Sequence, residues 1–230
     1  IPILQSKYAH VPIIRRQIDA HVGFIHRAFS NANLVNPTLQ RPRTEPVTIF
    51  LRGAAGVGKT KLVFKLAAIA CAEANKINAN MSDAEIDDAI ATNVYSRQIA
   101  NEYWDGYHSQ EVTVVDDFGQ KVDSQSNPNE EYLEFIMAAN SFSLPLHMAD
   151  ISQKSKTYFK SSMYIATTNL RTINPPSLYH APAFHRRMNL AFEVRLKPEF
   201  ADPITGRIRP DIASGDLRDD IHTFHAWNAA

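Results

Sequence analysis

Apolar residues recur at spacings of three and four near the beginning of the chain, which is the period of a helix with one apolar face. The residues concerned follow Pro12, a residue suited to a first helical turn, and they are Ile14, Ile18, Val22, Ile25 and Phe29. A proline-containing stretch over residues 31–46 then interrupts the pattern. We therefore expect an N-terminal helical extension and linker over residues 1–42, and a main domain over residues 43–230.

From residue 47 onward, short β-rich runs alternate with helical patterns. Strands are expected over residues 47–51, 94–97, 111–115, 163–167 and 190–196, the final run being the last strand of the sheet. Helices are expected over residues 59–75, 82–91 and 130–140 and near Phe184. Strands separated by helices predict an α/β fold, with a mainly parallel sheet and helices on both faces. Ligands of such sheets bind at the carboxyl ends of the strands.

Composition narrows the possible functions. The 230 residues include 24 basic and 24 acidic ones, which excludes binding to nucleic acid through a wholly basic surface but leaves room for a local basic channel. A single cysteine, Cys71, allows neither an internal disulfide nor a cysteine-based zinc site and suits a reducing compartment. No apolar run is long enough to span a bilayer. Because the chain opens on Ile1, we expect it to be a piece of a longer protein.

The strongest chemical motif lies between the first predicted strand and the helix after it. It reads Gly53, Ala54, Ala55, Gly56, Val57, Gly58, Lys59, Thr60 and fits the phosphate-binding loop of nucleotide-hydrolysing enzymes. Glycines let backbone amides approach phosphate oxygens, and the helix adds the positive end of its dipole. We expect Lys59 to reach the β- and γ-phosphates of ATP and the Thr60 hydroxyl to bind Mg²⁺. A glycine-rich turn matched by chance is the alternative.

Polar residues follow two further predicted strands. Asp116 and Asp117 end the run at 111–115, where a phosphate-loop enzyme holds its metal. We assign Asp116 to Mg²⁺, largely through water, and Asp117 to orienting or deprotonating the attacking water. Asn169 ends the run at 163–167 and can hold that water or sense the γ-phosphate. A kinase reading of Asp117-Phe-Gly fails because the chain has no His-Arg-Asp catalytic loop, and a GTPase reading fails because it has no Asn-Lys-x-Asp guanine motif.

Taken in order along the chain, these motifs resemble a known family. The phosphate loop, Tyr103-Trp-Asp-Gly-Tyr107, the run from Val112 to Gln120, Thr167-Thr-Asn169 and the pair Arg186-Arg187 are similar to the superfamily-3 helicases of positive-strand RNA viruses. The resemblance is nearest to the non-structural ATPase of picorna-like viruses. It implies an AAA+ fold, ATP hydrolysis with Mg²⁺, and assembly into rings, usually hexamers. It also implies a role in viral RNA replication on host membranes.

The resemblance assigns roles to further residues. Gly53 to Thr60 becomes motif A, Asp116 with Asp117 becomes motif B, and Asn169 becomes the motif C sensor. Arg186 and Arg187 match the paired arginines that reach the γ-phosphate of the neighbouring subunit, for which a solvated helix end is the plainer alternative. Lys154 and Lys156 match a segment that faces the central pore and touches the nucleic acid, for which a solvated charge run is the alternative. Ser155 stands where that segment usually has glycine.

These observations lead to one expected function and two alternatives. We expect an oligomeric AAA+ motor whose ATP hydrolysis drives the unwinding or remodelling of viral RNA. Its partners would be other copies of itself, single-stranded RNA, other viral replication proteins and, through flanking segments absent from this chain, a membrane. The expected location is the host cytoplasm, at membrane-associated replication sites. One alternative is a remodeller that separates no strands, and the other is an interaction module whose bound nucleotide controls only assembly.

Overall fold

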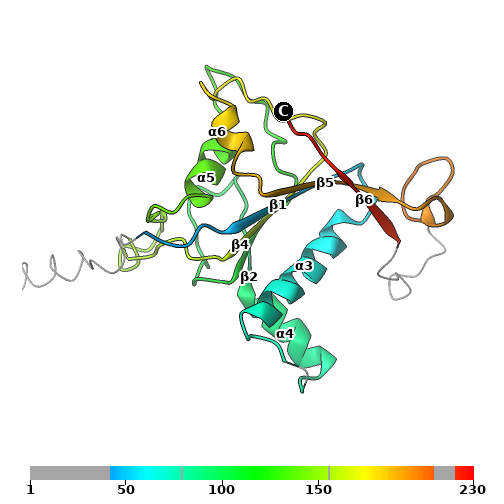
Figure 1. The fold of residues 1–230 in the computed structure, drawn as a ribbon. Coiled ribbons are helices and arrows are strands. Elements are labelled where there is room, and N and C mark those ends of the chain that lie inside the picture. Colours follow the sequence, from blue (N-terminus) through cyan, green and yellow to red (C-terminus); the bar gives the residue numbers. More distant parts are fainter. Residues whose placement is uncertain (1–41, 79, 155, 210–220) are drawn as a thin grey trace, which may run out of the picture. The chain divides into compact units, whose positions relative to one another are not determined.

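A six-stranded sheet lies at the centre of the part of the chain that the computed structural model describes, residues 42–78, 80–154, 156–209 and 221–230 (Figure 1). Its strands are β1 (Val47–Arg52), β2 (Val94–Ser96), β3 (Val112–Val115), β4 (Met163–Thr168), β5 (Leu190–Leu196) and β6 (His222–Ala226), in the spatial order β2-β3-β4-β1-β5-β6. The first five run parallel, which confirms the predicted α/β fold. The helix expected before residue 31 lies outside the described residues.

Helices cover both faces of this sheet (Figure 1). Helices α3 (Lys59–Glu73) and α4 (Asp83–Asn93) pack on one face, and α5 (Glu130–Ala138) and α6 (Pro182–His185) pack on the other. A capping box begins α4, since the Ser82 hydroxyl accepts from the Glu85 amide and the Glu85 carboxylate accepts from the Ser82 amide. A single 3₁₀ turn, Pro198–Phe200, follows β5. None of the described helices is long and apolar enough to cross a membrane.

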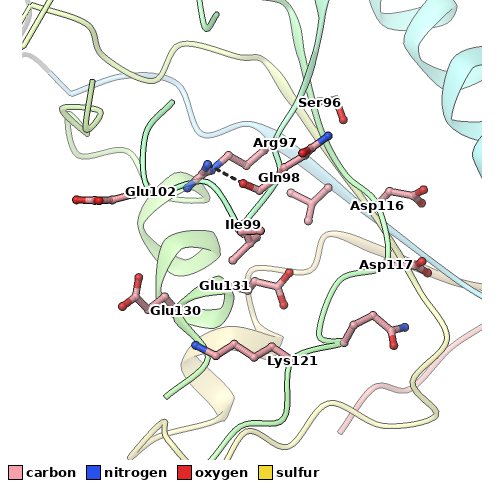
Figure 2. Close-up of a pocket in the computed structure, with 13 residues that line it drawn as sticks. Ser96, Arg97, Gln98, Ile99, Glu102, Asp116, Asp117, Lys121, Glu130 and Glu131 are labelled. Atoms are coloured by element: carbon pink, nitrogen blue, oxygen red, sulfur yellow. Dashed lines mark hydrogen bonds between the residues drawn. The ribbon is translucent and has the colours of Figure 1, made fainter. Parts of the chain in front are cut away.

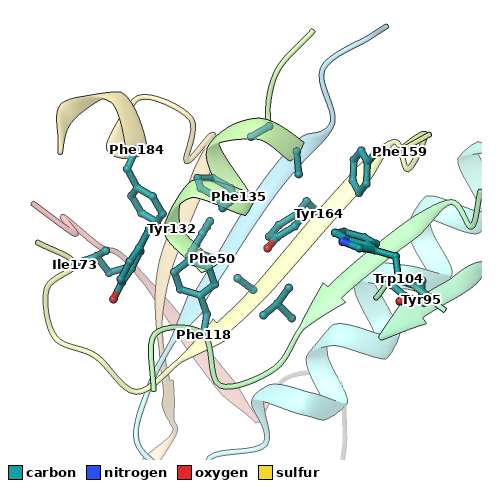
Figure 3. Packing of buried hydrophobic residues seen from close by; sticks show 14 of the residues in the cluster. Phe50, Tyr95, Trp104, Phe118, Tyr132, Phe135, Phe159, Tyr164, Ile173 and Phe184 are labelled. Atoms are coloured by element: carbon teal, nitrogen blue, oxygen red, sulfur yellow. The ribbon is translucent and has the colours of Figure 1, made fainter. Parts of the chain in front are cut away.

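Alternate residues of β1 belong to two different apolar cores, one on each face of the sheet. Ile49 and Leu51 of β1 join an aliphatic cluster beneath α3, whereas Phe50 points to the opposite face. There Phe50 lies edge-on to Phe118 and Phe135, with ring centroids 5.4 and 5.0 Å away (Figure 3). Because both faces of β1 are buried, its sequence is an almost continuous apolar run. Trp104 is also buried in the aromatic cluster, where it is a packing residue.

The prediction that residues 190–196 form the last strand is wrong, because β6 follows it. This strand pairs antiparallel with β5, from Phe192 opposite Ala226 to Leu196 opposite His222. Between the two strands, residues 201–208 turn back in a short hairpin, in which Ala201 bridges Ile208. The sheet is therefore mixed at this edge, where β6 lies beside β5 on the side away from β1. The chain after β5 also contacts the loop that follows β1.

Candidate active site

The predicted phosphate-binding loop, residues 53–60, joins the carboxyl end of β1 to the start of α3. Its first residue is fixed to the neighbouring strand, since the Gly53 amide donates to the Thr168 carbonyl of β4 at 3.1 Å. Gly58 has a φ of 86°, a left-handed conformation that glycine adopts readily, and it immediately precedes the helix. Ala54, Ala55, Gly56 and Thr60 are exposed, while Val57 and Lys59 are buried.

The ammonium group of Lys59 lies at the middle of the site. It donates to the carbonyl oxygens of Gly53 at 2.8 Å and Ala54 at 3.0 Å, and to Oδ1 of Asn169 at 2.7 Å. These contacts engage all three donors of an ammonium group. Burial lowers the pKa of Lys59, while the negative charges of Asp117 and, to a smaller extent, Asp116 act in the opposite direction. Lys59 is thus a positive charge held in place between the loop and the acidic residues.

The acidic pair begins one residue beyond the end of β3. Because Val115 lies opposite Ala166 in the register of β3 and β4, Asp116 meets Thr167, whose hydroxyl donates to the Asp116 carboxylate. The same hydroxyl accepts from the Asp117 amide at 3.0 Å. Asp117 has a φ of 53°, and its Oδ1 accepts from the Asn169 side-chain amide at 3.1 Å. The backbone therefore turns at Asp117, and side chains at the carboxyl end of β4 hold both carboxylates.

One connected network results from these contacts. Asn169 receives the Lys59 ammonium on its oxygen and donates from its nitrogen to Asp117, so a single amide joins the three predicted sites. Sequence reasoning singled out all three of these residues, and it included Thr167 in the Thr167-Thr-Asn169 motif without giving it a role. Thr167 is fully buried and ties Asp116 to the backbone of Asp117. Apart from that motif, its sequence signal is a hydroxyl at the end of a buried strand next to the acidic one.

A cavity of about 780 Å³ opens beside the two aspartates, on the side towards β2 and α5. Figure 2 shows Asp116 and Asp117 on one side of this cavity and Glu102 with Glu130 on the other. Arg97 also borders it, and its guanidinium is engaged by both carboxylate oxygens of Glu134, at 3.0 and 2.9 Å. The residues of the phosphate-binding loop do not line this cavity, so the acids separate it from the loop.

The arginine pair lies far from these groups. Thr48, near the amino end of β1, donates from its hydroxyl to the Arg187 carbonyl, and its amide donates to Oδ1 of Asn189 at 2.8 Å. Gly53 lies five positions after Thr48 along the strand, which is about 17 Å at about 3.3 Å a residue. The structure therefore places Arg186 and Arg187 at the other end of β1 from the phosphate-binding loop, and they do not join the network of their own chain.

Lys154 and Lys156 lie outside the network as well. They are exposed near the tip of a hairpin whose arms meet at Pro145 and Tyr158, on the amino-terminal side of β4. The Leu146 amide donates to the Thr157 carbonyl at 2.9 Å and closes the base of this hairpin. The predicted site residues thus form three groups, which are the network around Lys59, the arginine pair and the lysine hairpin.

Comparison with known proteins identifies relatives of this chain. A family model described as RNA helicase matches residues 49–170, which include the loop, both aspartates and Asn169. The replicase polyprotein of acute bee paralysis virus is 36% identical over 184 residues, 79% of this chain, and that of cricket paralysis virus is 33% identical over 159 residues, 69% of it. The genome polyprotein of human hepatitis A virus genotype IIIA is 28% identical over 192 residues, 84% of the chain. The matched regions span only 8–9% of these polyproteins.

Proposed function

The chain belongs to the RNA helicase family found in the replicase polyproteins of picornavirus-like viruses, and we propose that it is an ATP-hydrolysing motor that works on RNA as a ring of subunits. The observation that carries this proposal is the hydrogen-bonded series from Lys59 through Asn169 to Asp117. It brings together a cation for phosphate oxygens, an amide able to hold a water molecule, and a carboxylate able to orient or deprotonate that water.

The donor groups also fit magnesium. Carboxylate and hydroxyl oxygens are the ligands that this ion prefers, and it is usually held by one or two carboxylates together with the phosphates of the substrate. Asp116, largely through water, and Thr60 would supply the protein oxygens. When bound, the ion neutralises charge on the phosphates during transfer. The fixed orientation of Asp116 by the Thr167 hydroxyl keeps that carboxylate ready for this role.

The arginines support a shared site. Arg186 and Arg187 lie at the opposite end of β1 from the loop, farther than an arginine side chain reaches. A second copy of the chain could present them to the γ-phosphate, where a guanidinium neutralises developing charge. We therefore propose that catalysis needs a neighbouring subunit in a ring, a hexamer by family resemblance, built from an AAA+ domain over residues 43–230. Residues 1–42 would form an extension to that domain.

RNA and membrane contacts complete the proposal. Lys154 and Lys156 on their exposed hairpin could follow the phosphates of a single strand without reading its sequence. Other viral replication proteins and a membrane would be met through parts of the polyprotein outside this chain, at replication sites in the host cytoplasm. Separation of a tailed RNA duplex in the presence of ATP, but not in its absence, would distinguish unwinding from other remodelling.

Phosphate release per subunit, measured over a wide range of protein concentration, tests the catalytic proposal. We expect a rate that rises steeply with concentration, and we expect Lys59→Ala to abolish it because the phosphates lose their buried cation. Turnover that persists in pure Lys59→Ala protein would refute the assignment of the loop. A flat, substantial rate would remove the role of the arginines across an interface. Tight ATP binding without turnover, even in rings made by tethering subunits, would favour the module that only controls assembly.

A further inference from the structure

The chain after β5 contacts the phosphate-binding loop directly, and no predicted role covers that contact. The Ile208 amide donates to the Gly56 carbonyl at 3.1 Å, and Nε2 of His222 lies 2.7 Å from the Val57 carbonyl oxygen. Because a carbonyl oxygen only accepts, Nε2 of His222 carries the hydrogen. Two consecutive carbonyls of the loop are therefore held from outside, one by the hairpin at 201–208 and one by β6.

Holding these carbonyls fixes the direction of the amides that follow them. In a trans peptide the C=O and the N–H of the same unit point in opposite directions. With the Gly56 and Val57 oxygens turned towards the hairpin and β6, the amides of Val57 and Gly58 are turned the other way. Among the described residues neither amide has a hydrogen-bond acceptor. Successive amides pointing to one side are the arrangement that binds phosphate oxygens.

Side-chain packing supports the same alignment. Gly56 has a φ of 82°, and a Cβ added there would lie 2.8 Å from Cγ of Arg207. A Cβ added to Gly58 would lie 3.1 Å from Cδ1 of Ile208 and 3.3 Å from Nε2 of His222. The hairpin and β6 thus lie against Gly56 and Gly58, and a side chain at either glycine would require these neighbours to shift.

We propose that Ile208 and His222 are positioning residues that hold the phosphate-binding loop, so that the amides of Val57 and Gly58 face the nucleotide phosphates before the nucleotide binds. This inference rests on the proposed nucleotide binding. The site would recognise the phosphates of a nucleoside triphosphate rather than its base. A rigid loop binds more tightly because the cost of ordering it has already been met during folding.

Variants of the full chain can separate the hydrogen bond from the space that His222 fills. His222→Phe keeps a ring but has no donor, whereas His222→Gln keeps a nitrogen donor at a similar reach. The matched control is His225→Phe on the same strand, since His225 is exposed, lies opposite Glu193 of β5 and has its Nε2 3.3 Å from the Thr223 hydroxyl rather than near the loop. Ile208→Pro removes the hydrogen bond to the Gly56 carbonyl, because proline has no amide hydrogen. The backbone hydrogen bonds between the two arms of the hairpin are donated by the amides of Asp202 and Arg209, so this substitution leaves them in place.

The first measurement is the Kd for ATP with Mg²⁺ by titration calorimetry. We expect His222→Phe and Ile208→Pro each to raise Kd by about tenfold, the effect of about one lost hydrogen bond. His222→Gln should stay within about threefold of the unmodified chain, and His225→Phe should not differ from it. Unchanged binding in both His222→Phe and Ile208→Pro, or equal losses in His222→Phe and His222→Gln, would overturn the proposal.

The second measurement is amide hydrogen exchange without nucleotide, which tests the loop independently of the proposed activity. We expect His222→Phe to speed exchange across residues 53–60 and to leave α5 unchanged. Faster exchange in α5 as well would mean that His222→Phe lowers the stability of the whole domain. In that case, exchange across residues 53–60 in Ile208→Pro tests the positioning role instead. If the unmodified chain binds no ATP, the proposed function fails, whereas unchanged exchange across residues 53–60 in both variants would overturn the positioning role alone.

Discussion

The Thr167 hydroxyl gives the sharpest test of how the acidic pair is positioned. Replacing Thr167 with valine keeps the shape of this fully buried side chain and removes both its hydrogen bond to the Asp116 carboxylate and its acceptor for the Asp117 amide. Hydrogen bonds contribute about 0.5–1.5 kcal/mol each, and more when one partner is charged. Since Asp116 is exposed and can turn to water, we expect the free energy of unfolding to fall by only about 1–2 kcal/mol.

We expect Thr167→Val to affect the rate of ATP hydrolysis more than the free energy of unfolding. Residues that orient a metal-binding carboxylate typically affect activity by about 10–100-fold, and we expect a loss of kcat in that range together with a higher Mg²⁺ requirement. Phosphate release from ATP, titrated with Mg²⁺ at a fixed protein concentration, measures both effects. Urea unfolding of the same preparations measures the change in stability.

Thr168→Val is the matched control for this experiment. Thr168 is equally buried, and its hydroxyl donates to the Phe118 carbonyl at 2.8 Å and accepts from the Leu170 amide at 3.2 Å, without touching an acid. We expect a similar loss of stability, with kcat within about threefold of the unmodified chain. Normal kcat and Mg²⁺ dependence in Thr167→Val, or equal catalytic losses in the two variants, would refute the reasoning.

Two further predictions concern the aromatic core. Phe50→Ala should lower the free energy of unfolding, measured in urea, by about 3–5 kcal/mol, because the Phe50 ring is fully buried among other rings. Phe142 is 73% exposed, so Phe142→Ala should change the free energy of unfolding by less than about 0.5 kcal/mol. Equal effects of the two substitutions would contradict the assigned core. Burial raises the pKa of Tyr132 to about 12 and raises the pKa of Tyr164 well above its usual value. Above about pH 10 only the unfolded chain therefore releases these protons, and stability should fall as the pH rises. A urea midpoint that stays constant from pH 9 to about pH 11 would count against this.

Sequence reasoning succeeded where one strong local pattern decides the structure. Strand β1 has both faces buried and is an almost continuous apolar run, and the loop after it has glycines at fixed offsets, so both can be recognised from neighbouring residues alone. The positions of Asp116 and Asn169 follow from the rule that parallel strands end at one edge of the sheet. The structure adds the register that places these side chains next to one another.

Strand β6 shows why other parts could not be predicted. Three of its five residues are exposed and two are histidines, so it has neither the alternation nor the apolar run of a typical strand. Its pairing with β5 is set by tertiary contacts across a long connection. The contact between His222 and the phosphate-binding loop could not be predicted for the same reason, because the carbonyl that His222 contacts lies 165 positions away along the chain. Thr167 is hidden differently, since threonine is common in strands and needs no functional explanation there.

The separation of the two cores determines what optical spectroscopy can observe in this protein. Both tryptophans, Trp104 and Trp227, belong to the aromatic cluster on the side of α5 and α6, whereas the buried residues beneath α3 are all aliphatic. Intrinsic fluorescence therefore reports on one face of the sheet only. The other face has its own probe, because Cys71, the single cysteine, is buried in α3, where burial raises the pKa of its thiol. Tryptophan emission and thiol labelling together distinguish local opening of the helix that carries Lys59 from unfolding of the whole domain.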